Sequence, residues 1–299
     1  MALQRVTRAE LRVPRIDDCL EFHEVVMGLT VLHREPGRVC LGTGADGTVD
    51  LTLVEHEGRS GTTGFSIGVD SRDDLAEVQA RLQAMGTPWQ RATDPEPGVR
   101  ERLSCALPAG QVLALVTLAP SEQQYLHPGR GPHPRTRGIA PLDLDHITLR
   151  VGDQVRRTIE FLSASIGLKT SDIAMPPQAE PIAAWMRINE YHHDVAMFAG
   201  SPTETLDHLA WNVETFENIK RALDLLARHG IDAEAGPGRH GVGGNLYAYF
   251  WSPGGNRYEL TADMPRMADR NARTMVWPDP GATFSAWGAR HPESFKRGS

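Results

Sequence analysis

The chain has 299 residues, of which 31 are lysine or arginine and 38 are aspartate or glutamate, so its formal net charge is −7. A negative charge, with no basic patch interleaved with aromatic residues, excludes nucleic acid and anionic membrane surfaces as general partners. With 40% hydrophobic residues, the composition is that of a soluble globular protein long enough for two domains with separate cores.

The N-terminus and the cysteines indicate the compartment. The first residues, MALQRVTRAE, lack the apolar run of a secretory signal, and no segment approaches the length of a membrane span. Cys19, Cys40 and Cys105 are scattered without metal-binding or redox spacing, as is typical of reduced, buried thiols. The sequence therefore predicts a cytoplasmic protein.

The first half of the chain predicts two units with a common order, strand then helix then strands. The first unit has these elements at 11–14, 17–28, 29–33, 38–41 and 49–55. The second unit has them at 64–69, 71–86, 103–107 and 112–118. In the second unit, Ser71 is a suitable N-cap for the helix and Gly86 a suitable stop.

The same order returns after a stretch rich in glycine and proline. The second half predicts strands and helices at 147–151, 155–167, 208–213 and 215–230, followed by a hairpin within 245–260. The last helix has Thr215 as its N-cap and is predicted to turn four residues inward: Phe216, Ile219, Leu223 and Leu226.

The two halves also match residue by residue. Segment 11–13 aligns with 149–151, 65–69 with 209–213 and 108–115 with 253–260. Such repeats indicate duplicated structural units. The predicted fold is α+β, with four tandem βαβββ modules that form two similar half-barrel domains, each around a cavity. The predicted boundaries are an N-terminal domain at 1–126, a linker at 127–141, a C-terminal domain at 142–262 and a tail at 263–299. The tail, with Trp277 and Trp287, is expected to be either a lid over the cavity or disordered.

Three aligned positions differ in chemical kind between the halves. The second half has His146, His208 and Glu259 where the first has Arg8, Gly64 and Ala114. A glutamate on an apolar strand is costly to bury without a partner such as a metal ion. Each histidine, preceded by an aspartate, is by itself compatible with a structural role. Together, two histidines and a carboxylate are the ligand set of non-heme Fe(II) sites with open positions, so they predict a metal site.

Three segments of the second half carry a family resemblance: LDHITLRV at 144–151, LDHLAW at 206–211 and GGNLYAYFWSPGGNRYE at 243–259. With the two-half architecture, they resemble the type I extradiol ring-cleavage dioxygenases of the vicinal oxygen chelate superfamily, over nearly the whole chain. The resemblance implies an Fe(II) enzyme of aromatic catabolism that inserts both atoms of dioxygen into a substituted catechol and cleaves the ring bond adjacent to the diol.

The resemblance also implies roles for residues beyond the metal ligands. The family carries a His-His pair on an intervening strand, matched here by His192 and His193. By resemblance, His193 is the acid/base, and His240 and Tyr249 are catalytic groups that hydrogen-bond the substrate. Because adjacent strand residues face opposite ways, His193 and not His192 is expected to point into the cavity. Trp185 lies eight residues before His193 on what reads as the same strand, so it is predicted to line the substrate pocket, although core packing explains it equally well.

Two other functions fit the same fold. A metal-dependent glyoxalase-like isomerase or epimerase would keep the metal without oxygen chemistry, and a non-catalytic binding protein would need no metal triad. Manganese is an alternative to iron, because the same ligands accept both. The expected partners are a small-molecule catechol and dioxygen, with the chain forming a homo-oligomer of unspecified size. Arg150, Arg239 and Arg257 are candidates to meet a substrate carboxylate.

Overall fold

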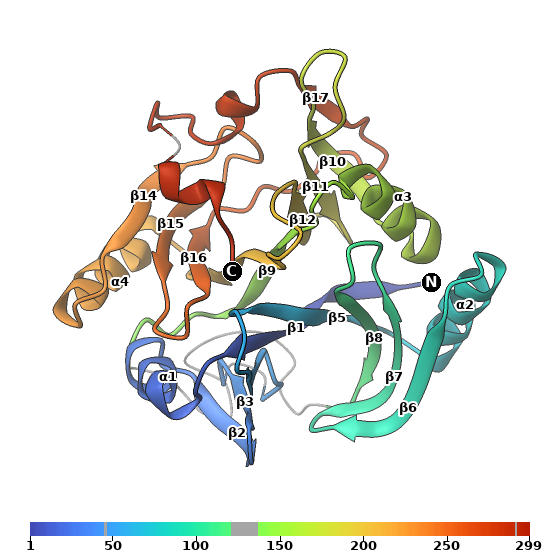
Figure 1. Ribbon diagram of the computed structural model, residues 1–299, viewed down its shortest axis with the longest axis horizontal. Helices are drawn as coiled ribbons and strands as arrows, with labels where there is room; N and C mark the ends of the chain where they lie inside the picture. Colours follow the sequence, from blue (N-terminus) through green and yellow to red (C-terminus); the bar gives the residue numbers. More distant parts are fainter. Residues whose placement is uncertain (45–46, 121–136, 291) are drawn as a thin grey trace.

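The computed structural model describes residues 1–44, 47–120, 137–290 and 292–299. Two sheets, one from each half of the chain, form the body of the molecule, with helices at its periphery (Figure 1). Most of the predicted linker at 127–141 lies outside the described residues. None of the described helices is long and apolar enough to cross a membrane.

Each half contains two βαβββ modules. The first half comprises β1 (Leu3–Val13), α1 (Asp17–Glu21), the π-helix η1 (Phe22–Val26), β2 (Thr30–Glu35), β3 (Arg38–Gly42), β4 (Leu51–Glu55), β5 (Gly61–Val69), α2 (Arg72–Ala84), β6 (Trp89–Glu96), β7 (Val99–Ala106) and β8 (Val112–Leu118). The second half comprises β9 (Asp143–Arg150), α3 (Val155–Ile166), β10 (Lys169–Ala174), β11 (Ala183–Arg187), β12 (Val195–Phe198), β13 (Leu206–Asn212), α4 (Phe216–Arg228), β14 (Ala233–Arg239), β15 (Leu246–Trp251) and β16 (Arg257–Ala262). The predicted fold of four βαβββ modules is confirmed.

The two sheets share one topology. The strand order is β2-β3-β4-β1-β5-β8-β7-β6 in the first half and β14-β15-β16-β13-β9-β12-β11-β10 in the second, where the tail strand β17 (Met275–Trp277) adds an edge. In both sheets the first strands of the two modules pair antiparallel at the centre, and each first strand pairs in parallel with the last strand of its own module. The centre of each sheet therefore brings the same module positions together.

The strand register supports the predicted alignment of the halves. In the first half Arg8 pairs with Ser66, which pairs with Ala114. In the second half His146 pairs with Ala210, which pairs with Glu259. Each trio spans the three central strands of its sheet, so Arg8 and Ala114 occupy the places of His146 and Glu259.

Gly64, the counterpart of His208, has a steric reason for being glycine. A Cβ atom at this position would lie 2.1 Å from the carbonyl oxygen of Val112 on the paired strand β8. Backbone atoms of a central strand cannot give way to such a contact. The first half is therefore unable to present a side chain where the second half presents His208.

Helix caps follow the sequence signals. The hydroxyl of Ser71 accepts a hydrogen bond from the Asp74 amide at 3.2 Å, and that of Thr215 accepts one from the Asn218 amide at 3.3 Å. Ile219 and Leu226 of α4 are fully buried, as predicted. The prediction that Phe216 faces the core is wrong: its side chain is 43% exposed and packs edge-on against Trp287. It begins the helix, where the apolar face has not yet reached the sheet.

Three strands carried no clear sequence signal. β6 is mostly exposed on both faces, so its residues show no alternation of polar and apolar side chains. β14 contains the segment AGPG, whose residues ordinarily mark turns. β10 also escaped prediction. All three follow the helix of their module and lie farthest from the centre of the sheet among its strands. Low burial accounts for β6 and β14, whereas half of the β10 residues are buried.

The tail is ordered against the second half. β17 pairs in parallel with β10, and the tail continues through the 3₁₀ helices η2 (Pro280–Thr283) and η3 (Glu293–Lys296). The carbonyl oxygen of Ser299 accepts backbone hydrogen bonds from Thr205 and Leu206, both at 2.9 Å. The C-terminus consequently ends in the middle of the molecule, between the halves (Figure 1).

Buried polar contacts join the two halves. His23 of η1 lies 2.7 Å from the hydroxyl of Tyr258 on β16, and the Gln111 amide donates to the carbonyl of Arg150 at 2.7 Å. The Asn256 amide donates to the carbonyl of Arg12 at 3.0 Å. Apolar residues of both halves belong to one continuous core cluster. The first half thus supports the second directly, although it lacks the candidate ligands.

Candidate metal centre

His146, His208 and Glu259 converge at the centre of the second sheet. They come from β9, β13 and β16, whose pairing was described above. The Nε2 atoms of the two histidines lie 3.4 Å apart, and they lie 3.2 and 3.1 Å from Oε2 of Glu259. All three residues are buried, with exposed fractions of 4% or less. Among the described residues this is the one group of three or more with ligand atoms spaced to hold a metal ion.

The spacing fits one face of an octahedral ion. Ligands about 2.1 Å from a common ion and at right angles to one another are about 3 Å apart. The three observed separations of 3.1 to 3.4 Å are close to that value. A facial arrangement leaves the opposite positions of the ion open to other ligands.

The aspartate before each histidine fixes its tautomer. Nδ1 of His146 lies 2.7 Å from Oδ1 of Asp145, and Nδ1 of His208 lies 2.7 Å from Oδ1 of Asp207. A nitrogen that faces a carboxylate carries the proton, so each Nε2 presents a lone pair to the site. Surface solvation of these aspartates is excluded for Asp207, which is fully buried.

The charge balance of the site calls for a cation. Oε2 of Glu259 is buried and has no hydrogen-bond donor among the described residues, although both Nε2 atoms are near. Three lone pairs facing one another are repulsive unless they share a positive charge. Without a metal a proton serves this purpose: burial disfavours charged His146, but hydrogen bonds to Asp145 and Glu259 outweigh burial and raise its pKa to about 10. The residues present therefore fit a divalent ion.

Buried arginines hold Asp207 in its charged form. Burial alone would raise the pKa of this carboxyl, but Arg150, His208 and Arg257 together lower it below its usual value. Arg150 approaches Oδ2 to 2.5 Å and Arg257 approaches Oδ1 to 3.4 Å. Asp207 is thus fixed on both sides, and it fixes the ring of His208 in turn.

His193 lies against the candidate ligands, and His192 does not. The ring of His193 lines the cavity and packs edge-on on that of His146, with centroids 4.4 Å apart. His192 lies behind it, with the two Nδ1 atoms 3.0 Å apart. The pair precedes β12 in a bend, so the expectation that it lies on a strand is wrong. Burial, followed by the nearby charge of His146, lowers the pKa of His193 well below its usual value, so this imidazole is neutral.

His240 and Tyr249 form a hydrogen-bonded pair on another part of the cavity wall. Nδ1 of His240 lies 2.7 Å from the carbonyl oxygen of Phe284 and must donate to it. Nε2 of His240 is then an acceptor for the Tyr249 hydroxyl, 2.9 Å away. Burial and the charge of Glu259 raise the pKa of Tyr249 well above its usual value, so the phenol stays protonated.

Trp185 lines the cavity for a reason that differs from the predicted one. It lies on β11 and not on the strand before His193, so the inference from a shared strand face is wrong. β11 pairs with β12, and Trp185 is opposite Ala196. Its ring packs edge-on against Phe198 at 5.7 Å, on the wall of the cavity.

The sequence did not point to several other residues of the cavity. Its remaining lining residues are mostly apolar or hydroxyl-bearing: Thr148, Phe198, Val242, Asn245, Thr283, Phe284 and Phe295. Three of them, Thr283, Phe284 and Phe295, belong to the tail, so the tail forms part of the cavity wall. The space left inside is about 40 Å³, far below the size of a typical small-molecule site.

The three arginines considered for a substrate carboxylate point elsewhere. Arg150 is engaged by Asp207 and by the carbonyl oxygens of Ala199 and Phe295. Arg257 is fully buried against Glu234 and Asp207, and Arg239 bonds Gly244 and Asp263. None of them lines the cavity.

Comparison with known proteins supports the same grouping. The chain is 23% identical over 268 residues to a metapyrocatechase of Pseudomonas sp. (strain CF600), covering 86% of this chain and 85% of that protein. It is 24% identical over 288 residues to a manganese-dependent 2,3-dihydroxybiphenyl 1,2-dioxygenase of Geobacillus genomosp. 3, covering 90% and 88%. The solved 2,3-dioxygenase LapB from Pseudomonas sp. KL28 has the same fold, with a TM-score of 0.83, 24% identity, and coverage of 93% of this chain and 98% of that one.

These relatives confirm the resemblance to extradiol dioxygenases noted in the sequence. The family model described as glyoxalase/bleomycin resistance protein/dioxygenase superfamily matches residues 5–102 and 143–260, most of both halves. The matched residues include the three candidate ligands and most of the four modules, with β8 outside the match. The chain therefore belongs to the glyoxalase/bleomycin resistance protein/dioxygenase superfamily.

Proposed function

We propose that this protein is an extradiol dioxygenase, which inserts both atoms of dioxygen into a catechol and opens the ring beside the two hydroxyls. The observation that carries the proposal is the facial group of His146, His208 and Glu259, with separations of 3.1 to 3.4 Å. The metapyrocatechase and the dihydroxybiphenyl dioxygenase to which the chain is similar support this reaction class.

The three residues would hold Fe(II), with Mn(II) as the alternative. The relative from Geobacillus is named as manganese-dependent, and the same oxygen and nitrogen donors suit both ions. When bound, such an ion supplies Lewis acidity toward the diol oxygens and the redox chemistry that dioxygen requires. Glu259 contributes the anionic ligand, and Asp145 and Asp207 keep both histidines in the tautomer that binds.

His193 is the proposed acid/base. Its Nδ1 is taken by His192, which leaves Nε2 to exchange a proton with a reactant in the cavity. A neutral imidazole can accept the proton of a catechol hydroxyl and return it later to oxygen that gains negative charge. The ring has little freedom to turn, because it packs on His146 and His192 on two sides.

Tyr249 and His240 are proposed to bind and orient the diol. The protonated phenol of Tyr249 can donate to a substrate oxygen once it leaves Nε2 of His240. His240 is held by the carbonyl of Phe284, so its free Nε2 would then accept from a substrate hydroxyl. The binding step therefore exchanges one internal hydrogen bond for two to the substrate.

The cavity wall favours an uncharged substituent on the ring. Trp185, Phe198 and Phe284 line it, and none of the described lysines and arginines does. A buried carboxylate without a cationic partner would be strongly unfavourable. The proposed substrates are accordingly catechols with apolar substituents, bound against Trp185 and its neighbours.

The tail is proposed to act as a lid. The space inside the cavity, about 40 Å³, is smaller than a catechol, and a movement of its wall would make room for the substrate. The tail residues Thr283, Phe284 and Phe295 form that wall and belong to no module of the sheets. The proposed bounds are those predicted from the sequence, 142–262 for the catalytic domain and 263–299 for the tail.

Anaerobic purification followed by metal analysis and an oxygen-consumption assay tests the proposal. One Fe or Mn per chain, with dioxygen uptake and a yellow ring-fission product on adding catechol or 4-methylcatechol, is the expected result. Reconstitution of the metal-free protein with each ion then identifies which one supports turnover. Bound metal without oxygen uptake would favour a glyoxalase-like isomerase, and a protein that binds no metal would overturn the proposal.

A further inference from the structure

The first half-barrel contains its own cavity, at the place that corresponds to the candidate metal centre. Its volume is about 490 Å³, within the range of small-molecule sites. Arg8 and Ala114 line it, and the strand register makes them the counterparts of His146 and Glu259. Where the second half would hold a cation, the first half therefore places a guanidinium group.

Two guanidinium groups, those of Arg8 and Arg102, and one carboxylate, that of Glu10, line this cavity. Oε2 of Glu96 contacts Arg8 and lies 3.7 Å from both Arg38 and Arg102. Glu10 is paired with Arg38 at 2.7 Å and accepts from the hydroxyl of Thr63 at 2.6 Å. Arg38 also lies 3.8 Å from the exposed Glu35, so three guanidinium groups face three carboxylates, and Arg102 has the loosest pairing.

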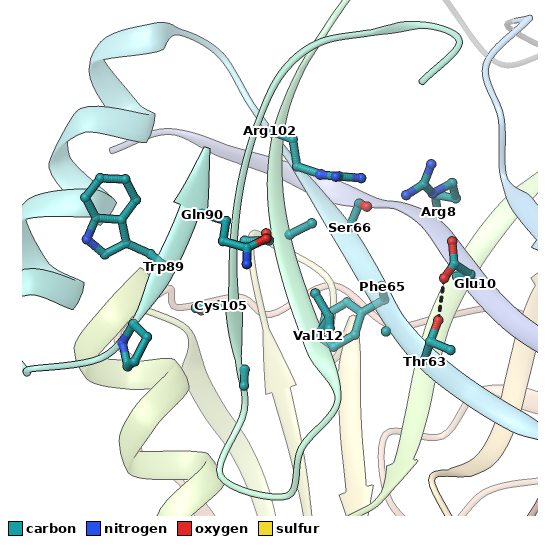
Figure 2. A pocket seen from close by; sticks show the side chains of 15 residues that line it. Arg8, Glu10, Thr63, Phe65, Ser66, Trp89, Gln90, Arg102, Cys105 and Val112 are labelled. Atoms are coloured by element: carbon teal, nitrogen blue, oxygen red, sulfur yellow. Dashed lines mark hydrogen bonds between the residues drawn. The ribbon is translucent and has the colours of Figure 1, made fainter. Parts of the chain in front are cut away.

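Arg102 is the residue whose charge is most available to a ligand, because its carboxylate contact is 3.7 Å long, whereas Glu96 contacts Arg8 closely. Arg8 is 8% exposed, and its Nε atom has no hydrogen-bond partner among the described residues. Figure 2 shows the guanidinium groups of Arg8 and Arg102 directed toward Ser66 from opposite sides, with the Glu10–Thr63 pair beside them. An anion between the two groups would accept hydrogen bonds from the terminal N–H groups that Arg8 and Arg102 turn toward the cavity.

The remaining wall of the cavity is apolar. Val112 and Trp89 line it and are 43% and 37% exposed, and Phe65 adds an aromatic ring below the charged cluster (Figure 2). Large apolar side chains open to solvent at the mouth of a cavity are typical of a surface that a ligand covers. Positive charge at one end and aromatic side chains at the other select a ligand with a carboxylate and a ring.

We infer that the first half-barrel is a second ligand site, separate from the proposed catalytic centre, which binds a small aromatic monocarboxylate. The carboxylate lies between Arg8 and Arg102 near Ser66, and the ring lies against Phe65, Trp89 and Val112. The site differs from the other half-barrel in holding its anion with fixed guanidinium groups, so it needs no metal.

Calorimetric titration of the metal-loaded protein with benzoate tests the inference. The titration is run under anaerobic conditions, with and without saturating catechol, so that binding at the proposed catalytic centre is recognised. One benzoate per chain is expected to bind in both cases, and benzamide, which has the same shape without the charge, is expected to bind at least tenfold more weakly. No benzoate binding, or binding abolished by catechol, would overturn the inference.

Substitutions locate the site. Arg8→Met is expected to weaken benzoate binding at least tenfold, and Arg102→Met, at a half-exposed position that tolerates substitution, at least threefold. Arg34→Met is the matched control: this arginine is in the same half and ion-paired with Asp17, but it is exposed and does not line the cavity. If Arg102→Met and Arg34→Met bind benzoate equally well, the ligand is elsewhere and the inference is wrong.

Discussion

At the scale of the residue, one carboxylate determines the character of the candidate metal centre. Glu259 is fully buried, and burial would raise its pKa, but the imidazoles around it, first that of His146, outweigh burial and lower its pKa well below the usual value. The same position in the first half is Ala114, and there no metal group forms among the described residues. The difference between the two half-barrels thus rests on few side chains in an otherwise common frame.

Glu259→Gln is predicted to lose bound metal and turnover together. The amide keeps the shape of the side chain but removes the negative charge that offsets a divalent ion. Metal content measured on the purified variant should fall at least tenfold. Arg8→Met, at the counterpart of His146, is the control and should keep its metal. Full metal content in Glu259→Gln would exclude this group as the metal site.

His193→Asn is predicted to separate binding from chemistry. Because His193 is not among the proposed ligands, metal content and KM for a catechol should stay within about threefold, while kcat should fall by about 10²- to 10⁴-fold, the usual contribution of a general acid/base. His192→Asn, one residue away and behind it, should lower kcat much less. Equal losses of kcat in the two variants would contradict the assignment of the acid/base role to His193.

At the scale of the element, β-strand register and a short π-helix position the site. Pairing of β9, β13 and β16 places the three candidate ligands on one face, and η1 brings His23 under β16, where it meets Tyr258. His23 is fully buried, and burial lowers its pKa from 6.5 to about 4. Because His23 is buried and neutral, its contact with Tyr258 between the two halves is sensitive to acid.

Acid is predicted to destabilise the fold through His23. Between pH 6.5 and 4 the unfolded chain binds a proton at this residue and the folded chain does not, so stability falls as the pH is lowered through this window. From pH 7.5 to 5 the loss from this group is about 2 kcal/mol. Urea unfolding at pH 7.5 and pH 5 measures the free energy of unfolding. Its decrease between the two pH values should be about 2 kcal/mol smaller in His23→Asn than in the parent protein. His33→Asn, at an exposed position, should behave as the parent protein, and identical pH dependence in all three proteins would exclude His23 as the cause.

At the scale of the whole molecule, the tail completes a cavity that the modules leave open. Phe295 packs edge-on against Tyr249 at 4.9 Å, against Phe284 at 5.6 Å and under the guanidinium of Arg257 at 4.2 Å. The chain then ends at Ser299, hydrogen-bonded to the start of β13 between the two halves. The last residues therefore connect the wall of this cavity with the junction of the half-barrels.

Phe295→Ala is predicted to cost about 3 kcal/mol of folding stability and to enlarge the cavity. Truncation removes the buried ring, which is 4% exposed, and leaves space beside Tyr249. Chemical denaturation should show the loss, and relative kcat/KM should shift toward bulkier catechols. Trp287→Ala, in the same tail but 57% exposed, should change stability by less than about 1 kcal/mol and leave the selectivity unchanged. Equal effects of the two substitutions would show that the tail does not form the pocket wall.

The sequence by itself determined the modular fold and the candidate ligands, because the internal repeat aligns equivalent strands and exposes His146, His208 and Glu259 as departures from it. Only the tertiary structure decided how the remaining groups meet. Trp185 reaches the cavity from a different strand than the alternation suggested, and the tail residues of the wall are more than 70 residues away in the chain from β13. Local periodicity reports which face of an element is buried, but the partner on that face is set by packing between distant segments, which one sequence does not contain.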